Sequence, residues 1–271
     1  MGAALSADPR VDMITFTGST ATGRAILTAG ASTVKKTLLE LGGKSTHIVC
    51  DDADFNACLP MAAMFACVMS GQSCILSSRV LLPRSRYDEG LEILKTMMEQ
   101  FPVGGDPWTP GIMQGPQISA MQRQKTLSLI QSGIADGARL VTGGGIPENL
   151  PTGYYVQPTL LADVDPPTSE IAQTEIFGPV ITVTPYDTDD EAVEISNNTI
   201  YGLSGDVTSG DDERALNIAL RLRTGSVTTN GHSFFGITSP FGGTKQSGLG
   251  HRNGDEGYRE YLNMKTIGVR P

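Results

Sequence analysis

The chain has 271 residues, a formal charge of −9 and 18% charged residues. This length allows one or two ordinary domains with a substantial buried core. Asp and Glu outnumber Lys and Arg by 29 to 20 and no basic block offers a surface for phosphates, so we expect no nucleic-acid partner. The longest apolar run covers residues 61–69, far fewer than a bilayer requires, so we expect no membrane segment.

The N-terminus has no basic region followed by an apolar one, so we expect no secretory signal and a cytoplasmic location. No Cys-x-x-Cys pair occurs, and the spacing of cysteines and histidines does not match a metal site. In an intracellular chain each cysteine is first expected to be a small buried hydrophobe. The cysteines are Cys50, Cys58, Cys67 and Cys74, and the histidines are His47, His232 and His251.

The first predicted elements are a strand, a turn and a helix. Residues 11–16 form a short apolar run, residues 17–20 follow as a turn, and residues 21–29 have a helix-favouring composition. Residues 33–41 and 47–50 are predicted strands on either side of a Gly-Gly turn. This part therefore begins with a strand–helix–strand pattern.

A long apolar helix is predicted next, with Asp54 as its N-cap and its end near residue 70. Pro60 predicts a distorted first turn or a later start, and the apolar composition on all sides predicts burial. The later segments predict an α/β fold with a largely parallel sheet, and a tail strand that lies apart from it. They are a strand at 79–82, helices at 87–100 and 119–135, a strand at 154–161, alternating elements at 180–186, 190–197, 213–222 and 225–229, and the tail strand at 258–269.

Two residues stand out as candidates for chemistry. Cys74 follows Gly71 on a predicted loop after the apolar helix, where a loop can present a thiol to a cleft. Glu40 lies at the end of an apolar strand, and partial desolvation there would raise its proton affinity, as a general base requires. A surface ion pair between Glu40 and Lys44 is the alternative that the local sequence leaves open.

These segments together resemble the aldehyde dehydrogenase superfamily, from Gly2 to the end of the chain. The matching motifs stand in the family's order: Phe16-Thr17-Gly18-Ser19, the Glu40 segment up to Ser45, Gly71-Gln72-Ser73-Cys74, Glu175-Ile176-Phe177-Gly178-Pro179, Tyr201-Gly202-Leu203 and residues 240–248. The resemblance implies a remnant of a Rossmann-like cofactor domain at 1–42, a catalytic domain at 43–245 and a tail with an oligomerisation strand at 246–271. It also implies a homo-oligomer, either a dimer or a tetramer.

The resemblance implies that the protein oxidises a small-molecule aldehyde to a carboxylic acid with NAD or NADP. Cys74 would form a thiohemiacetal and then a thioester, and Glu40 would activate the deacylating water. For Ser19 a plain helix cap is an equal alternative, and for Glu175 a solvated loop carboxylate is a weaker one. The cofactor contacts implied are Gly18, Ser19, Leu41, Glu175 and Phe177.

The sequence also departs from the family pattern. Residues 1–5 resemble the inside of a family helix, and the upstream asparagine and lysine of the family have no counterpart here. Cys67 and Leu76 differ from the usual residues near the nucleophile, which affects substrate fit. We therefore expect a fragment that is impaired alone, with an inactive relative kept for oligomerisation or regulation as the second interpretation. A cysteine-dependent hydrolase or esterase is the third interpretation. It comes last because such an enzyme would pair its thiol with a histidine, and no histidine segment suggests that pairing.

Overall fold

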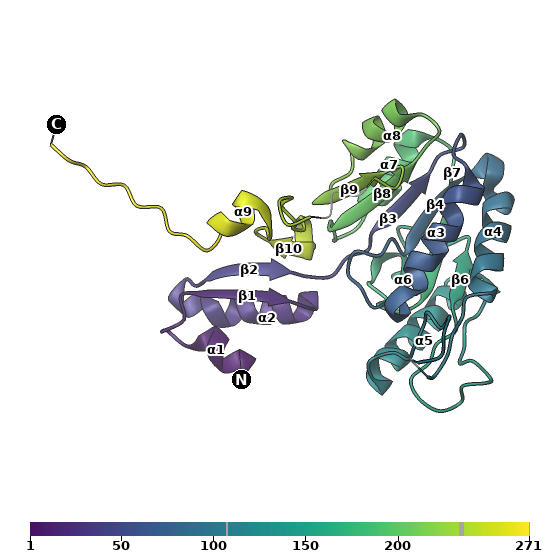
Figure 1. Cartoon of the computed structure of the whole chain (residues 1–271), viewed down its shortest axis with the longest axis horizontal. Helices are drawn as coiled ribbons and strands as arrows, with labels where there is room; N and C mark the ends of the chain where they lie inside the picture. Colours follow the sequence, from purple (N-terminus) through teal and green to yellow (C-terminus); the bar gives the residue numbers. More distant parts are fainter. Residues whose placement is uncertain (107, 233–235, 271) are drawn as a thin grey trace.

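The strands of the chain form two sheets that lie in separate parts of the molecule (Figure 1). The computed structural model describes residues 1–106, 108–232 and 236–270. A small sheet of three strands is built from the two ends of the chain, and a larger sheet of seven strands is built from the middle.

The small sheet contains a parallel strand–helix–strand unit. β1 (Met13–Thr17) pairs in parallel with β2 (Lys36–Glu40), and α2 (Thr20–Gly30) connects them. β2 begins later than predicted because the 3-10 helix η1 (Ala31–Thr33) precedes it and Val34 is left-handed, with φ at 51°. From the far end of the chain, β10 (Gly248–Leu249) adds to β2 in the antiparallel sense, and α1 (Gly2–Ala7) packs on α2.

The large sheet confirms the predicted α/β fold with a largely parallel sheet. Its strand order is β5-β6-β7-β4-β3-β8-β9, and every neighbouring pair is parallel except β5 with β6. The strands are β3 (Thr46–Val49), β4 (Arg79–Pro83), β5 (Arg139–Thr142), β6 (Thr159–Ala162), β7 (Val180–Tyr186), β8 (Ser204–Thr208) and β9 (Ser226–Thr229).

Helices cover both faces of this sheet and enclose its apolar residues. One core packs α3 and α4 against β4, β6 and β7, and another packs α7 and α8 against β3 and β8. Among the described residues, no helix is both long and apolar enough to cross a bilayer. The helices of this part are α3 (Phe55–Cys67), η2 (Val68–Gly71), η3 (Arg84–Arg86), α4 (Tyr87–Glu99), α5 (Ala120–Ala135), α6 (Glu170–Gln173), α7 (Asp189–Asn197) and α8 (Asp212–Ala219), while η4 (Lys245–Ser247) leads directly into β10 of the small sheet.

The predicted N-cap of α3 is confirmed, but two other predictions for this helix are wrong. The Asp54 carboxylate accepts hydrogen bonds from the first-turn amides, so the helix begins at Phe55 in spite of Pro60. Pro60 lies inside the helix, where its ring removes one helical hydrogen bond. Met61 and Phe65 are 46% and 52% exposed, so one side of the helix is apolar and uncovered rather than buried.

The strand predicted at residues 258–269 is not formed within this single chain, and its pairing with another chain stays a prediction. Tyr258 lies in the short helix α9 (Gly254–Arg259), and residues 260–270 have no regular structure. The chain there runs away from both sheets (Figure 1). A strand requires a neighbour for its backbone hydrogen bonds, and among the described residues no strand of this chain pairs with this segment.

Candidate active site

Cys74 lies on a tightly held loop between η2 and β4. The chain turns sharply before it, because Met69 and Ser70 are left-handed and Gly71 has φ at +69°. The Ser70 hydroxyl donates to the Gly115 carbonyl at 2.9 Å, and the Gln117 amide donates to the Ser70 carbonyl at 2.8 Å. These bonds attach the start of the loop to the segment that precedes α5.

Two other chain segments touch this loop at glycines. A Cβ at Gly71 would lie 2.1 Å from the Gly178 carbonyl carbon, and a Cβ at Gly43 would lie 2.4 Å from the Cys74 carbonyl oxygen. Because residues 43, 74 and 178 all precede strands of the parallel sheet, the loop lies at the amino edge of that sheet. Only glycine at 43 and 71 permits this approach.

Glu40 is buried at the end of β2, with only 3% of its surface exposed. Neither carboxylate oxygen has a hydrogen-bond partner among the described residues. Burial raises the pKa of Glu40 from 4.5 to about 7, against a smaller lowering by the positive charge of Arg252. Lys44 is also buried and its Nζ also lacks a partner within the described chain, so the alternative of a surface pair between Glu40 and Lys44 is wrong.

Glu175 lies beside Gly42 and Gly43. Its Oε1 accepts a hydrogen bond of 3.0 Å from the Gly43 amide, and a Cβ at Gly42 would lie 2.6 Å from Oε2. Burial raises the pKa of Glu175, and the hydrogen bond from Gly43 partly offsets this rise. A solvated loop carboxylate, the weaker alternative for this residue, does not fit that contact.

The thiol and the two carboxylates influence one another electrostatically. Burial raises the pKa of the Cys74 thiol, and the negative charges of Glu175 and Glu40 raise it further. The structure therefore brings together three groups that lie 34 and 101 positions apart in the sequence. The thiol at rest is protonated at neutral pH, so a base must accept its proton when it acts as a nucleophile.

The other cysteines differ from Cys74 in their surroundings. Burial raises the pKa of Cys50 and of Cys58 to about 11, and that of Cys67 to about 12. His47 is buried in β3 with its Nε2 bonded to the Thr208 hydroxyl at 2.8 Å, so it is not placed as a base for Cys74. This arrangement gives no support to a cysteine hydrolase with a thiol–histidine pair.

The residues expected to contact a cofactor surround Glu40 and Glu175. The Ser19 hydroxyl accepts a hydrogen bond of 3.2 Å from the Thr22 amide, so Ser19 is the N-cap of α2. The Gly18 amide donates to the backbone carbonyl of Glu40 at 3.0 Å, which connects the start of this helix to the residue that carries the buried carboxylate. Leu41 packs against α2, and Phe177 has a left-handed backbone next to Glu175.

Polar groups on β8 that the sequence did not single out also hold the Cys74 loop. The Ser204 hydroxyl donates to the Ile75 carbonyl at 3.0 Å, and the Ser77 hydroxyl donates to the Asp206 carboxylate. The two residues of each hydrogen-bonded pair are 129 positions apart in the sequence, so no local sequence pattern could reveal the pairs. The aligned ends of β3, β4 and β8 bring them together.

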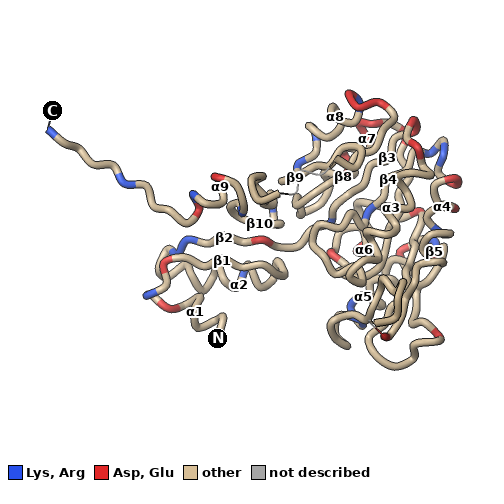
Figure 2. Tube along the Cα trace, in the orientation of Figure 1, with Lys and Arg blue, Asp and Glu red and all other residues tan. Residues whose placement is uncertain are grey.

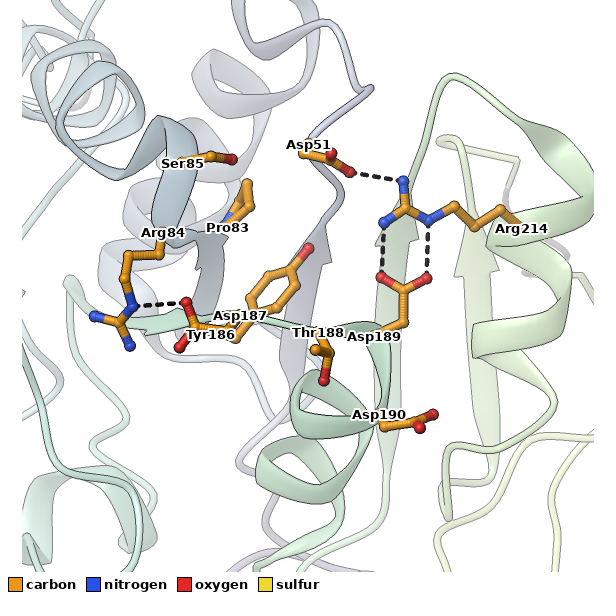
Figure 3. Close-up of a pocket in the computed structure, with 10 residues that line it drawn as sticks. All are labelled: Asp51, Pro83, Arg84, Ser85, Tyr186, Asp187, Thr188, Asp189, Asp190 and Arg214. Atoms are coloured by element: carbon orange, nitrogen blue, oxygen red, sulfur yellow. Dashed lines mark hydrogen bonds and ion pairs between the residues drawn. The ribbon is translucent and has the colours of Figure 1, made fainter.

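A cavity of about 450 Å³ lies at the opposite, carboxyl edge of the parallel sheet (Figure 3). It lies near the acidic end of the molecule around α7 and α8 (Figure 2). The carboxylates in it are already paired: Arg214 binds Asp51 and Asp189, Arg84 binds Asp187, and Arg221 binds Asp190. None of the predicted site residues lines this cavity.

The fold and the site together define an α/β protein with a loop thiol and a buried carboxylate at the amino edge of its sheet. The chain belongs to the aldehyde dehydrogenase family, whose model matches residues 1–267. It is 44% identical over 268 residues to 3-succinoylsemialdehyde-pyridine dehydrogenase of Pseudomonas sp, and 41% identical over 272 residues to human aldehyde dehydrogenase 1A1. The alignments cover 98% and 99% of this chain but only 56% and 53% of those proteins, so the chain spans about half their length.

Solved structures of aldehyde dehydrogenases share this fold. The Mycobacterium tuberculosis enzyme in complex with NAD⁺ superposes with a TM-score of 0.91 at 45% identity, over 94% of this chain and 52% of that one. Aldehyde dehydrogenase C of Pseudomonas syringae, a mutant in complex with NAD⁺ and octanal, gives 0.94 at 40% identity, over 98% and 54%. The expected family and fold are therefore confirmed.

Proposed function

We propose that the protein to which this chain belongs oxidises a small-molecule aldehyde to a carboxylic acid with NAD or NADP, through a thioester on Cys74. The observation that carries this proposal is the convergence of the Cys74 thiol with the buried carboxylate of Glu40 and the half-buried carboxylate of Glu175. The NAD complexes of the family structures support the choice of cofactor class.

The residues present are suited to a dinucleotide. Ser19 caps the Thr22 amide at the start of an 11-residue helix, and the amino end of such a helix attracts phosphate. One oxygen of Glu175 is held by Gly43, which leaves the other as an acceptor for ribose hydroxyls. When bound, the nicotinamide supplies the hydride acceptor. Gly18, Ser19 and Leu41 would contact the cofactor from the small sheet, and Glu175 and Phe177 from the catalytic loops.

In the proposed reaction Cys74 gives up its proton to solvent water and its sulfur bonds to the aldehyde carbon, which leaves an oxyanion on the former carbonyl oxygen. The Cys74 amide would stabilise that charge. Loss of a hydride from the same carbon, which a bound nicotinamide would accept, and re-formation of the carbonyl group yield the thioester. Glu40 then takes a proton from a water molecule that attacks the thioester, and the carbon–sulfur bond breaks to release the acid and the thiolate.

We also propose that this chain alone oxidises aldehydes slowly, that it works in the cytosol, and that it is a homo-oligomer. The relatives are about twice as long, and the positioning of a cofactor and substrate can lower a barrier by roughly 7–11 kcal/mol. All four cysteines are free thiols, as suits a reducing compartment. We expect the chain to act in its longer protein rather than as an inactive relative.

The test separates the thiol chemistry from the hydride transfer. Purified chain is given either p-nitrophenyl acetate or a short aldehyde with NAD, with Cys74→Ala and Glu40→Gln as matched variants. We expect a burst of p-nitrophenol that Cys74→Ala abolishes, slow turnover that Glu40→Gln stops after the burst, and little NADH. A burst that survives in Cys74→Ala would refute the assignment of the nucleophile, and robust NADH formation would refute the proposed impairment.

A further inference from the structure

The surroundings of Glu40 contain a second buried polar group without a partner. Within the part of the chain that the structure describes, both carboxylate oxygens of Glu40 and the Nε of Arg252 are buried and accept or donate no hydrogen bond. A buried polar atom without a hydrogen-bond partner destabilises the folded chain. Two such groups of opposite charge in one region indicate an interaction that is used at another stage of the reaction.

Glu40 and Arg252 belong to the same face of the small sheet. Side chains alternate along β2, so Glu40 and Leu38 lie on the face opposite Leu39, which packs on α2. Thr15 of β1 pairs in register with Leu38, and its hydroxyl accepts a hydrogen bond of 3.3 Å from the Arg252 guanidinium. The guanidinium is thereby held on the face that carries the Glu40 carboxylate.

The backbone of Arg252 is fixed on both sides. Its amide and carbonyl form a two-way β-bridge with Phe241, with N–O distances of 2.6 and 2.7 Å. Four residues earlier, Gly248 of β10 pairs directly with Glu40 of β2. The segment that carries Arg252 is therefore attached to the strand that carries Glu40.

Other charged groups around Glu40 do not replace Arg252. Lys36, on the same face, pairs with Glu260 at 3.3 Å at the opposite end of β2. From the large sheet the Cys74 thiol feels the negative charge of Glu40, and a thiol carries no positive charge. Arg252 is the positive group whose charge lowers the pKa of Glu40, in opposition to the burial that raises it.

We propose that Arg252 is a positioning residue for the general base: its guanidinium holds the ionised carboxylate of Glu40 on the sheet face between turnovers and keeps it ready to accept a proton from water. The proposal rests on the proposed role of Glu40. When Glu40 takes up the proton its attraction to the guanidinium falls.

The experiment measures the pKa of Glu40 directly, by NMR of protein with ¹³C-labelled glutamate carboxyl groups. The Glu40 signal is identified by its absence in Glu40→Gln. Arg252→Gln and Arg252→Met remove the charge, Arg252→Lys retains it, and Arg259→Gln removes a charge from the exposed side of α9 as the matched control. Two neutral variants are used so that a failure of one to fold does not prevent the measurement.

We expect both neutral variants to raise the pKa of Glu40, and Arg252→Lys and Arg259→Gln to leave it near the wild-type value of about 7. A rise to about 8 would reduce the ionised fraction at pH 7 about fivefold, and ester deacylation would slow by the same factor. An unchanged pKa in the neutral variants, or a rise in Arg259→Gln of equal size, would overturn the proposal. Absence of any Cys74-dependent ester turnover would refute the proposed function instead, and the NMR result would still decide the role of Arg252.

Discussion

Glu40→Gln is expected to make the protein more stable at pH 8 while it stops deacylation. The burial that suits Glu40 to act as a base favours its neutral form, and raises its pKa from 4.5 to about 7 in the folded state. At pH values below 4.5 the carboxyl group is neutral in both the folded and the unfolded chain, so it imposes no pH-dependent cost. Between pH 4.5 and 7 only the unfolded chain ionises, and the free energy of unfolding falls steadily.

Above pH 7 this cost is complete. A pKa difference of about 2.5 corresponds to roughly 3 kcal/mol at 1.36 kcal/mol per pKa unit, so the neutral Gln variant should gain up to that amount. Urea unfolding of both proteins at pH 4.5 and pH 8 measures the gain, and Glu99→Gln on the exposed end of α4 controls for the loss of a negative charge. A Gln variant that is no more stable than wild type at pH 8 would refute the reasoning.

Three further outcomes are expected. Brief iodoacetamide treatment should modify Cys74 before Cys50, Cys58 and Cys67, as mass spectrometry of the folded protein can establish; earlier labelling of Cys50 or Cys58 would contradict the site. Gly43→Ala should lower stability by about 1–3 kcal/mol in urea and slow acylation of Cys74, because the new Cβ meets the Cys74 carbonyl; wild-type behaviour in both assays would count against this. Deletion of residues 258–271 should lower the mass found by light scattering, and an unchanged mass would argue against a tail that pairs with another chain.

Local signals predicted the elements that have strong caps or continuous apolar patterns. Asp54 and Ser119 each accept hydrogen bonds from the amides of the helix that follows, as short polar side chains do at a helix start. β8 is not predicted from the sequence because Gly205 and Asp206 are poor strand formers. Only its position between β3 and β9 in the sheet makes it a strand. β5 is short and partly exposed, so it lacks a clear apolar pattern as well.

The candidate site could be predicted only in part. The family resemblance identified Cys74 and Glu40, whereas neither local sequence alone distinguishes a reactive residue from a structural one. No local sequence pattern indicates the role proposed for Arg252, because that role depends on the pairing of β10 with β2 across more than 200 positions of the sequence. The hydrogen bond between Gly43 and Glu175 likewise exists only after the two loops have met.

The site geometry follows from backbone contacts as much as from side chains. At Gly43 and Gly71 any Cβ would overlap another backbone, so these two glycines determine how closely the catalytic loops approach. Glu40 reaches the same place from the small sheet, through the short connection that leads from β2 into β3. The distance between the Cys74 thiol and the Glu40 carboxylate is therefore set by the relative position of the two sheets. A change that moved one sheet against the other would separate Cys74 from Glu40, although each side chain would keep its own local surroundings.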